Sequence, residues 1–442
     1  MPHPNPSPEG EGLCVKDFGT SSDPRVQAQL DRLAALSLPQ GRLGLETMHA
    51  LLARLGDPHT RLPPVFHVAG TNGKGSTCAF LRAMLEADGK RVHMTTSPHL
   101  VRYNERIRLA GKLIEDGPLA ELLEEVLDAA EGLNPSFFET TIAAAFLAFS
   151  RTPADACVVE VGLGGRFDAT NVLGPEVLAA CGIAALGIDH ERFLLAPEDG
   201  VPQEPVERIA FEKSGILKCG VPFATLEYPP AIEGVISESA YKAQAKWFDG
   251  WHVEARAEGF DFISERGSCS GLPLPALPGA HQIGNAGLAI AMLQIGGFDP
   301  GEQGVRKGLL AANWPARLQR LSNGPLAQGR EVWLDGGHNR SAGDALAAHF
   351  AGRRVHLVIG MIEGKDSLGL LEPMQESLAS VTVVPIPTHD HHRVEAFGPG
   401  AIAAHDVPAA LAGFPDDDLP ILIAGSLYLA GEVLRLNGEL PE

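Results

Sequence analysis

The chain has 442 residues, of which 45% are hydrophobic and 20% are charged, and this mixture excludes a disordered or fibrous protein. This length exceeds one ordinary core, so we expect two domains. With 35 Lys and Arg against 55 Asp and Glu, the formal net charge is −20, which argues against nucleic acid as a partner because an acidic surface repels phosphate backbones.

Residues 1–23 are rich in Pro, Gly and Ser, which predicts a flexible N-terminal arm. Apolar residues at helical spacing predict a helix over residues 45–55. From residue 65 apolar strands alternate with amphipathic helices, a pattern that predicts a mostly parallel sheet with right-handed crossovers. We expect strands at 65–69, 91–97, 156–161, 178–188 and 221–225, and helices at 76–88, 117–131, 137–150, 204–217 and 281–295.

A glycine-rich loop joins the first of these strands to its helix in the segment VFHVAGTNGKGST, residues 65–77. Glycines allow backbone N–H groups to turn toward a phosphate, the helix N-terminus adds positive potential, and Lys74 supplies a full charge. The loop departs from a strict Walker A motif because Gly75 separates Lys74 from Ser76. The strand–loop–helix context favours phosphate binding over a plain glycine turn.

A second alternation of strands and helices begins after residue 315, with strands expected at 332–334, 355–359, 381–385 and 421–424. The turn-rich segment 321–330 is the candidate linker. The sequence thus predicts an α/β protein with a large N-terminal P-loop domain, residues 24–320, whose sheet is mostly parallel. A smaller C-terminal Rossmann-like α/β domain is expected over residues 321–442. Ligands usually bind where two such domains meet.

Polar side chains follow four of the expected parallel strands: Lys74, Ser97, Glu160 and His190. Considered alone, Ser97 can be a helix N-cap, His190 a structural histidine and Glu160 a capped residue of a strand–turn pair. The carboxyl ends of parallel strands share one edge of a sheet, where ligands bind. The convergence of these side chains therefore favours Mg²⁺ with oxygen ligands together with a nucleotide phosphate.

Further candidates lie farther along the chain. Lys213, on the helix expected at 204–217, is by itself a solvated lysine of a helix face. Near the domain junction, Asn285 lies on an expected helix and Asp335 follows a strand, while Arg317 lies between them in sequence. A guanidinium and a carboxylate from opposite sides of a hinge can grip a nucleotide when domains close, although each can equally be a surface residue.

The six cysteines are scattered, without a C-x-x-C pair or zinc spacing, which is typical of reduced thiols in the cytoplasm. The opening residues MPHPNPSPEGEG lack the basic and apolar regions of a secretion signal. Apolar stretches such as 421–430 are too short to span a membrane. We therefore expect a cytoplasmic protein with no membrane partner.

Eight sequence features occur in an order that resembles the folylpolyglutamate synthase/dihydrofolate synthase family, within the Mur ligase superfamily, over roughly residues 40–435. They are VAGTNGKGS, SPHLVRYNERI, EVGLGGRFDATN, the Asp189–His190 pair, AFEKSGI, HQIGNA, PARLQ and LDGGHN. The resemblance implies an enzyme that uses ATP to phosphorylate a carboxylate and then lets the amine of glutamate attack the acyl phosphate. It also implies small-molecule substrates, namely dihydropteroate or folate, L-glutamate and ATP, and we expect a monomer.

The resemblance also implies roles for single residues. ATP would be contacted by the glycine-rich loop and the domain junction, through Asn72, Gly73, Lys74, Gly75, Ser76, Asn285, Arg317 and Asp335. Two Mg²⁺ sites would take their ligands from Ser97, Glu160 and His190. Lys213 matches a lysine that is carbamylated in these enzymes, and the residues expected to be catalytic are Lys74, Glu160, His190, Lys213 and Arg317.

The resemblance places the pterin or folate substrate against three short segments. They comprise Gly41, Arg42 and Leu43, then Ser136, Phe137, Phe138 and Glu139, then Phe167, Asp168 and Ala169. The aromatic pair suits a flat ring. The segment between His190 and Lys213 carries more residues than in relatives, so its conformation is left open.

Three functions are left open at this point. The first is a bifunctional ligase that acts on dihydropteroate and on reduced folates, and the second is a folylpolyglutamate synthase alone. The third is a catalytically silent nucleotide-binding scaffold, which has no need of the intact set Lys74, Glu160, His190 and Asp335.

Overall fold

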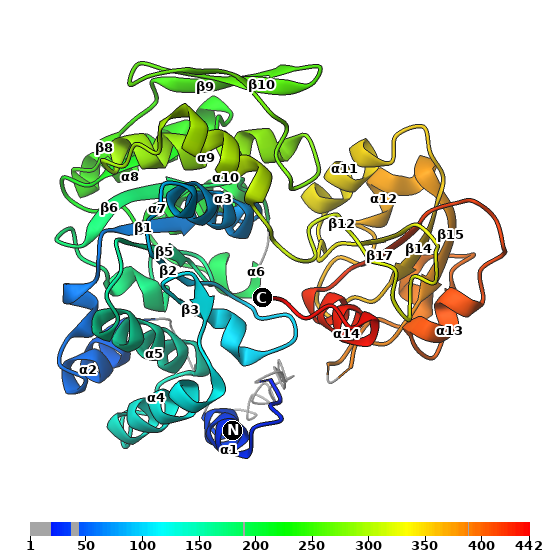
Figure 1. The fold of residues 1–442 in the computed structure, drawn as a ribbon, viewed down its shortest axis with the longest axis horizontal. Helices are drawn as coiled ribbons and strands as arrows, with labels where there is room; N and C mark the ends of the chain where they lie inside the picture. Colours follow the sequence, from blue (N-terminus) through cyan, green and yellow to red (C-terminus); the bar gives the residue numbers. More distant parts are fainter. Residues whose placement is uncertain (1–18, 37–43, 189–190, 388) are drawn as a thin grey trace, which may run out of the picture.

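The structure, a computed structural model, describes residues 19–36, 44–188, 191–387 and 389–442. Most of the expected N-terminal arm, the segment Gly41–Leu43 and the pair Asp189–His190 lie outside these residues. The described chain forms two lobes, each built on its own sheet (Figure 1). Among the described residues, no helix is long and apolar enough to cross a membrane.

The N-terminal lobe is centred on an eight-stranded sheet with the order β4-β3-β2-β5-β1-β6-β7-β8. Six strands run parallel to one another: β1 (Val65–Ala69), β2 (Val92–Thr95), β5 (Ala156–Glu160), β6 (Leu178–Ile183), β7 (Pro222–Thr225) and β8 (Lys246–Trp247). A hairpin of β3 (Ile107–Leu109) and β4 (Lys112–Leu113) extends one edge in the antiparallel sense. The mostly parallel sheet is confirmed, although β6 ends five residues earlier than 188.

Helices cover both faces of this sheet, and the side chains of β1 alternate between them. Phe66 and Val68 join the core formed with α3 (Lys74–Ala87), α9 (His281–Ile295) and α10 (Gly301–Ala311). Val65 and Ala69 join the opposite core. It is covered by α1 (Pro24–Ala34), α2 (Glu46–Arg54), α4 (Asp116–Ala129), α5 (Phe137–Arg151), α7 (Pro205–Ser214) and α8 (Pro230–Ala243). Because both faces of the sheet are buried, the sequences of β1 and β5 are mostly apolar and do not alternate with polar residues.

A small antiparallel sheet was not anticipated from the sequence. It has the order β11-β10-β9, with β9 (Trp251–Arg256), β10 (Gly259–Ser264) and β11 (Cys269–Leu272). Phe260 and Phe262 of β10 are fully buried and pack into the core that contains α9. The sheet lies over α9 at the outer side of the lobe (Figure 1).

The C-terminal lobe holds a six-stranded sheet with the order β12-β13-β17-β14-β15-β16. The strands are β12 (Gln319–Arg320), β13 (Val332–Leu334), β14 (Val355–Ile359), β15 (Leu378–Val383), β16 (Ile402–Ala403) and β17 (Ile421–Ala424), and only the β12–β13 pair is antiparallel. Its helices are α11 (Arg340–His349), α12 (Leu371–Met374), α13 (Val407–Ala412) and α14 (Leu427–Asn437). Since β12 already pairs within this sheet, the exact division near residue 320 stays a prediction.

Candidate active site

The loop between β1 and α3 has the form of a phosphate-binding loop. Gly73 precedes α3 with φ of +79°, a left-handed conformation that favours glycine. The Lys74 ammonium turns back over the loop and donates to the carbonyls of Gly70, at 3.0 Å, and Thr71, at 3.3 Å. The loop therefore presents a lysine and the amino end of a 14-residue helix at the carboxyl edge of the sheet.

Two side chains lie in close contact with the glycines of this loop. A Cβ atom at Gly73 would lie 2.5 Å from Oδ1 of Asn285 on α9, and one at Gly75 would lie 2.5 Å from Nε1 of Trp314. The Asn285 amide is itself oriented by donating to Gln282, at 3.0 Å. The structure thus brings Asn285 to the loop as expected, and it adds Trp314, which sequence reasoning missed although it stands just before the PARLQ segment.

Ser97 and Glu160 meet because β5 lies between β2 and β1. The Ser97 amide donates to Oε2 of Glu160 at 3.3 Å, and the Glu160 side chain is buried. Burial raises the pKa of this carboxyl, and the nearby Lys74 ammonium opposes that rise. A buried carboxylate with one long hydrogen bond is suited to a cation, and Glu160 and Ser97 offer the oxygen donors that Mg²⁺ prefers.

The part of the site that His190 was expected to supply lies outside the described residues. Within residues 19–36, 44–188, 191–387 and 389–442, no group of three or more His, Cys, Asp and Glu side chains can hold a metal ion. A second metal site at Glu160 and His190 therefore stays a prediction. Of the expected metal ligands, the structure brings together Ser97 and Glu160.

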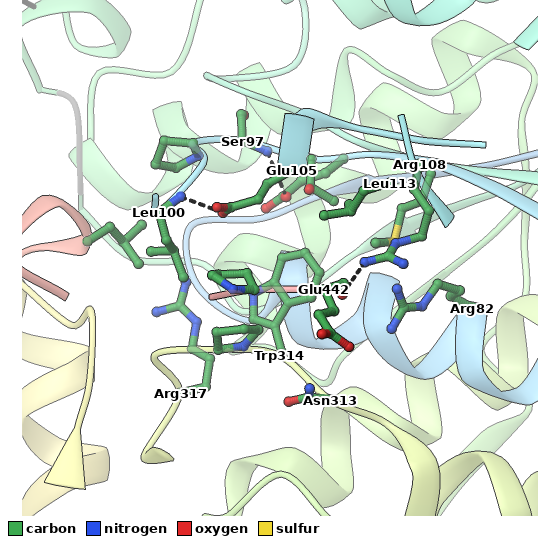
Figure 2. Close-up of a pocket in the computed structure, with 17 residues that line it drawn as sticks. Arg82, Ser97, Leu100, Glu105, Arg108, Leu113, Asn313, Trp314, Arg317 and Glu442 are labelled. Carbon is green, nitrogen blue, oxygen red and sulfur yellow. Dashed lines mark hydrogen bonds between the residues drawn. The ribbon is translucent and has the colours of Figure 1, made fainter. Parts of the chain in front are cut away.

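The C-terminal lobe faces this edge with Arg317 and Asp335. Arg317 lines a cavity of about 60 Å³ together with Ser97, Glu160 and Trp314 (Figure 2). Asp335 follows β13, and its two oxygens accept from the amides of Leu318, at 2.8 Å, and Gly337, at 2.7 Å. In this way Asp335 holds the backbone next to Arg317.

A direct polar contact also joins the lobes at the phosphate loop. The side-chain amides of Asn72 and Asn339 donate to each other's oxygens at 3.3 Å. Asn339 is the N-cap of α11, since its Oδ1 accepts from Ala342 at 3.0 Å. Asn339 follows Asp335 in the loop after β13, so this contact brings that loop next to Asn72 of the phosphate loop.

Lys213 is buried in α7, against the glycine loop that follows β5. A Cβ atom at Gly165 would lie 2.9 Å from the Lys213 Cα, and the Arg166 amide donates to the Glu212 carbonyl at 2.8 Å. This close approach needs a residue without a side chain at position 165. A solvent-facing Lys213, the simpler of the two hypotheses, is therefore wrong.

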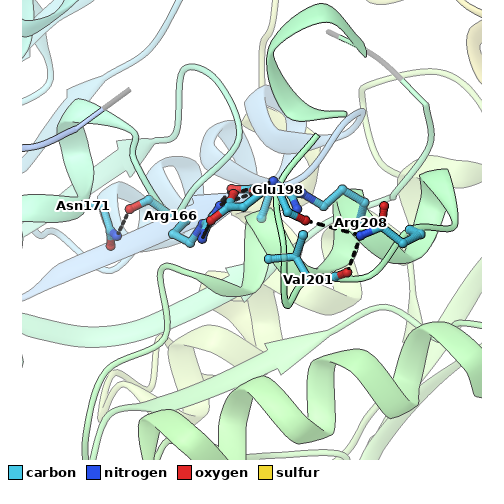
Figure 3. A network of polar contacts seen from close by, with 7 residues as sticks. Arg166, Asn171, Glu198, Val201 and Arg208 are labelled. Atoms are coloured by element: carbon cyan, nitrogen blue, oxygen red, sulfur yellow. Dashed lines mark hydrogen bonds and ion pairs between the residues drawn. The ribbon is translucent and has the colours of Figure 1, made fainter. Parts of the chain in front are cut away.

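A network of ion pairs surrounds this helix (Figure 3). The Glu212 carboxylate pairs with Arg166 at 2.7 Å and with Arg208 at 3.0 Å, and Glu198 pairs with Arg166 at 2.6 Å and with Arg208 at 2.8 Å. Glu198 belongs to the segment between α6 (Glu191–Leu194) and α7 whose conformation the sequence left open. The network ties that segment to the Lys213 helix.

The SFFE segment begins α5, and two of its four residues cap that helix. Ser136 Oγ accepts from the Glu139 amide at 3.2 Å, and the Glu139 carboxylate accepts from the Ser136 amide at 2.8 Å, which is a capping box. The Phe138 ring lies against Gly162, where a Cβ atom would be 2.3 Å away, and the Arg106 guanidinium lies 5.1 Å from the Phe137 ring centre.

Phe167, Asp168 and Ala169 follow in the loop that Phe138 touches. The Arg166 guanidinium lies 4.4 Å from the Phe167 ring centre. Asp168 is buried, accepts from the Leu163 amide at 2.7 Å and from the Thr170 amide at 3.0 Å, and has its pKa raised by burial. The second and third substrate segments are thus neighbours, whereas Gly41, Arg42 and Leu43 lie outside the described residues.

Comparison with known proteins gives both sequence and structural relatives, although no protein-family model matches the chain. The chain is 35% identical to the dihydrofolate synthase/folylpolyglutamate synthase of Bacillus subtilis (strain 168) over 356 residues. This aligned region covers 75% of this chain and 78% of the relative. The structure of Escherichia coli FolC in complex with DHPP and ADP matches with a TM-score of 0.82 at 29% identity, over 93% of this chain and 97% of that one. A bifunctional folylpolyglutamate synthase/dihydrofolate synthase with Mn, AMPPNP and L-glutamate bound matches with a TM-score of 0.80 at 28% identity, over the same shares.

Proposed function

The chain belongs to the dihydrofolate synthase/folylpolyglutamate synthase family, and we propose that it is the ATP-dependent ligase that adds L-glutamate to dihydropteroate and to reduced folates. The observation that carries the proposal is the meeting of Lys74, Ser97 and Glu160 on one sheet edge with Arg317 of the other lobe. A phosphoryl group transferred from ATP to a carboxylate spreads negative charge in the transition state, and such charge needs fixed cations from both sides.

Each part of this edge has a role in that reaction. The 70–76 loop and Lys74 hold the ATP phosphates, Asn285 and Asp335 position the nucleotide and its surroundings, and Arg317 stabilises the phosphoryl group in transfer. Ser97 and Glu160 would hold one Mg²⁺, and the family resemblance adds a second ion at Glu160 and His190; when bound, such ions would neutralise phosphate charge. The acyl phosphate then forms the amide with the amine of glutamate as phosphate leaves.

The pterin end of the substrate lies in this proposal where α5 meets the loop after β5. Phe137, Phe138 and Phe167 offer aromatic surface there, and Ala169 follows in the same loop. A contribution from Gly41, Arg42 and Leu43 rests on the family resemblance alone. The capping bonds of Ser136 and Glu139 and the buried Asp168 keep the backbone of both segments in place.

An assay of the purified protein tests the function. With Mg²⁺, ATP, L-glutamate and dihydropteroate we expect ADP and dihydrofolate in equal amounts, and with tetrahydrofolate we expect its diglutamate. Product from tetrahydrofolate alone would restrict the enzyme to chain extension. ADP release that depends on neither acceptor would contradict the proposal.

We also propose that Lys213 carries a carbamate in the active enzyme. A buried ammonium is unfavourable beside divalent cations, and carbamylation replaces that positive charge with a negative one. Burial of Lys213 in α7 and the engagement of Glu212 with two arginines are consistent with such a group.

We expect Lys213→Ala to lose at least about a hundredfold in kcat, because the anionic group is missing, and to recover activity with added formate or acetate. The matched control is Lys242→Ala, which removes an exposed lysine of α8 paired with Glu238 at 2.7 Å and leaves kcat unchanged. Absence of rescue, together with an unmodified Lys213 in a crystal of the enzyme with ATP and Mg²⁺, would reject the carbamate.

The described cysteines agree with a reducing compartment. Cys78, Cys157, Cys181, Cys219 and Cys269 are free thiols, and burial raises the pKa of the first three. High thiol pKa values make poor nucleophiles. We propose a cytoplasmic monomer on this basis and on the resemblance.

A further inference from the structure

Three arginines beside the active site have no role in the reaction described so far. Arg82 lies on α3, Arg102 in the loop after β2 and Arg108 on β3. Arg82 and Arg108 line the cavity that also contains Ser97, Glu160 and Arg317. Arg102, Arg108 and Lys112 line a neighbouring open cavity of about 600 Å³. Arg108 is common to both, so a line of cations leads from the surface toward Glu160.

Within the described part of the chain, each of these arginines has one unsatisfied donor, although Arg108 also donates from Nη1 to the Gly111 carbonyl at 2.9 Å. The Nε atoms of Arg82, Arg102 and Arg108 are buried and have no hydrogen-bond partner among the described residues. Burial, reinforced by the Arg82 charge, lowers the pKa of Arg108 to about 10. Arg82 has a carboxylate at longer range, with its Nε 3.8 Å from Glu86. Buried donors that are left unsatisfied are costly, which favours the binding of a further acceptor such as an anion.

Two of the acidic residues that line these cavities, Glu105 and Asp116, have hydrogen-bond partners of their own. The Glu105 carboxylate accepts from the amides of Leu100, Val101 and Arg102 at 2.7–2.9 Å. Asp116 accepts from the Asn104 side chain at 2.9 Å. In these bonds the two carboxylates accept from backbone amides and from a side-chain amide. The guanidinium groups can therefore bind another acceptor.

The last described residues supply that acceptor in this conformation. Glu439 is anchored to the C-terminal lobe by the Gln319 amide, at 2.9 Å, and by Ser322, at 2.8 Å. The chain then returns to the N-terminal lobe (Figure 1). There Arg102 donates to the Pro441 carbonyl at 3.2 Å, and Arg108 donates to the main-chain oxygen of Glu442.

The segment brings one acidic residue, Glu442, into the path. Figure 2 shows Glu442 between Trp314 and the guanidinium groups of Arg82 and Arg108, within the cavity that reaches Glu160. Glu442 offers one side-chain carboxylate, and its main-chain oxygen accepts from Arg108, whereas a ligand with several carboxylates can offer a separate carboxylate to each of the three guanidinium forks. A ligand with several carboxylates would therefore bind these cations better than residues 441–442 do.

We propose that Arg82, Arg102 and Arg108 bind the carboxylates of the γ-linked glutamate chain of a folate substrate, and that residues 441–442 cover this path until such a chain displaces them. The inference rests on the proposed function, because that activity makes a substrate with one carboxylate for each added residue. The path leads to Glu160, next to the proposed site of phosphoryl transfer. A glutamate chain longer than one residue can therefore extend along it from the carboxylate that reacts.

The test compares tetrahydrofolate substrates that carry one and three glutamates. We expect Arg108→Gln to raise KM for the triglutamate about tenfold, with KM for the monoglutamate and kcat changed less than about twofold. Arg108→Lys keeps the charge and should restore part of the loss. The matched control Arg91→Gln removes an exposed arginine ahead of β2 and should change neither KM. A chain ended after Leu440 should lower KM for the triglutamate alone.

Equal changes in KM for both folates would overturn the inference, as would a rise confined to KM for free L-glutamate. Binding of a γ-linked triglutamate that lacks the pterin, measured by calorimetry, separates this inference from the proposed function. Binding to the parent that weakens in Arg108→Gln supports the chain site even in a protein without ligase activity. Normal activity with triglutamate binding that is the same in both proteins would overturn the chain site and leave the function standing.

Discussion

Lys74→Ala should lose ATP turnover by about a thousandfold while the fold is kept. The Lys74 ammonium is the full positive charge that the loop places over its own carbonyls, at 3.0 and 3.3 Å, at the amino end of α3. When ATP binds, its phosphate would replace those carbonyls as the partner of Lys74. The interaction between Lys74 and the phosphate strengthens as negative charge moves in the transition state. The overall charge of −20 gives phosphate no other general attraction.

The measurement is ADP release in a coupled assay, with circular dichroism and thermal melting to verify the fold. Lys90→Ala is the matched control, because Lys90 lies just beyond the other end of α3, where it pairs with the exposed Asp88 at 3.7 Å. That variant should turn over ATP at the parent rate. Turnover of Lys74→Ala within about tenfold of the parent would exclude a phosphate-binding role for this loop.

Glu160→Gln should lower kcat about a thousandfold and leave KM for the folate within a fewfold. The amide keeps the shape of the side chain and its contact with the Ser97 amide but lacks the negative charge that a divalent cation needs. Higher Mg²⁺ should restore little activity. Normal kcat with a raised KM for folate would instead make Glu160 a substrate contact. Glu176→Gln, an exposed change on the same lobe, serves as the control.

The thermal stability of Glu160→Gln distinguishes the loss of a metal ligand from the loss of the fold. Burial raises the pKa of Glu160 above its unfolded value, so the ionised carboxylate costs stability as pH rises through that raised pKa. Without Mg²⁺ at pH 7 we therefore expect Glu160→Gln to melt no lower than the parent. Added Mg²⁺ should raise the melting temperature of the parent alone. A variant that melts well below the parent would give Glu160 a structural role.

Much of the fold could be predicted because the pattern of each local segment matches its burial. The strand–glycine loop–helix unit at 65–87 was expected from apolar residues, glycines and a lysine in that order, and α9 has the bounds 281–295 that its apolar pattern indicated. The antiparallel sheet of β9–β11 was missed, although β9 alternates apolar with polar residues as a half-buried strand does.

The arrangement of the candidate active site could be predicted from the sequence to a smaller extent than the fold. Sequence motifs could nominate Ser97 and Glu160, but their contact exists because the sheet order inserts β5 between β2 and β1. Sequence could not tell whether Ser136 and Glu139 serve a ligand or a helix, since the same two side chains make a capping box. It also could not reveal the burial of Lys213, which lies against Gly165 of the loop that follows β5.

The sequence by itself therefore determined the chemistry available to this protein: a phosphate loop, a strand-end carboxylate and two α/β units. That information is local, because glycine geometry, apolar periodicity and charge are properties of neighbouring residues. Only the tertiary structure decided which side chains share a cavity, as Arg82, Arg108 and Arg317 do with Glu160 across two lobes. Such contacts join residues far apart in the chain, and their energies depend on burial and on partners that no local pattern records.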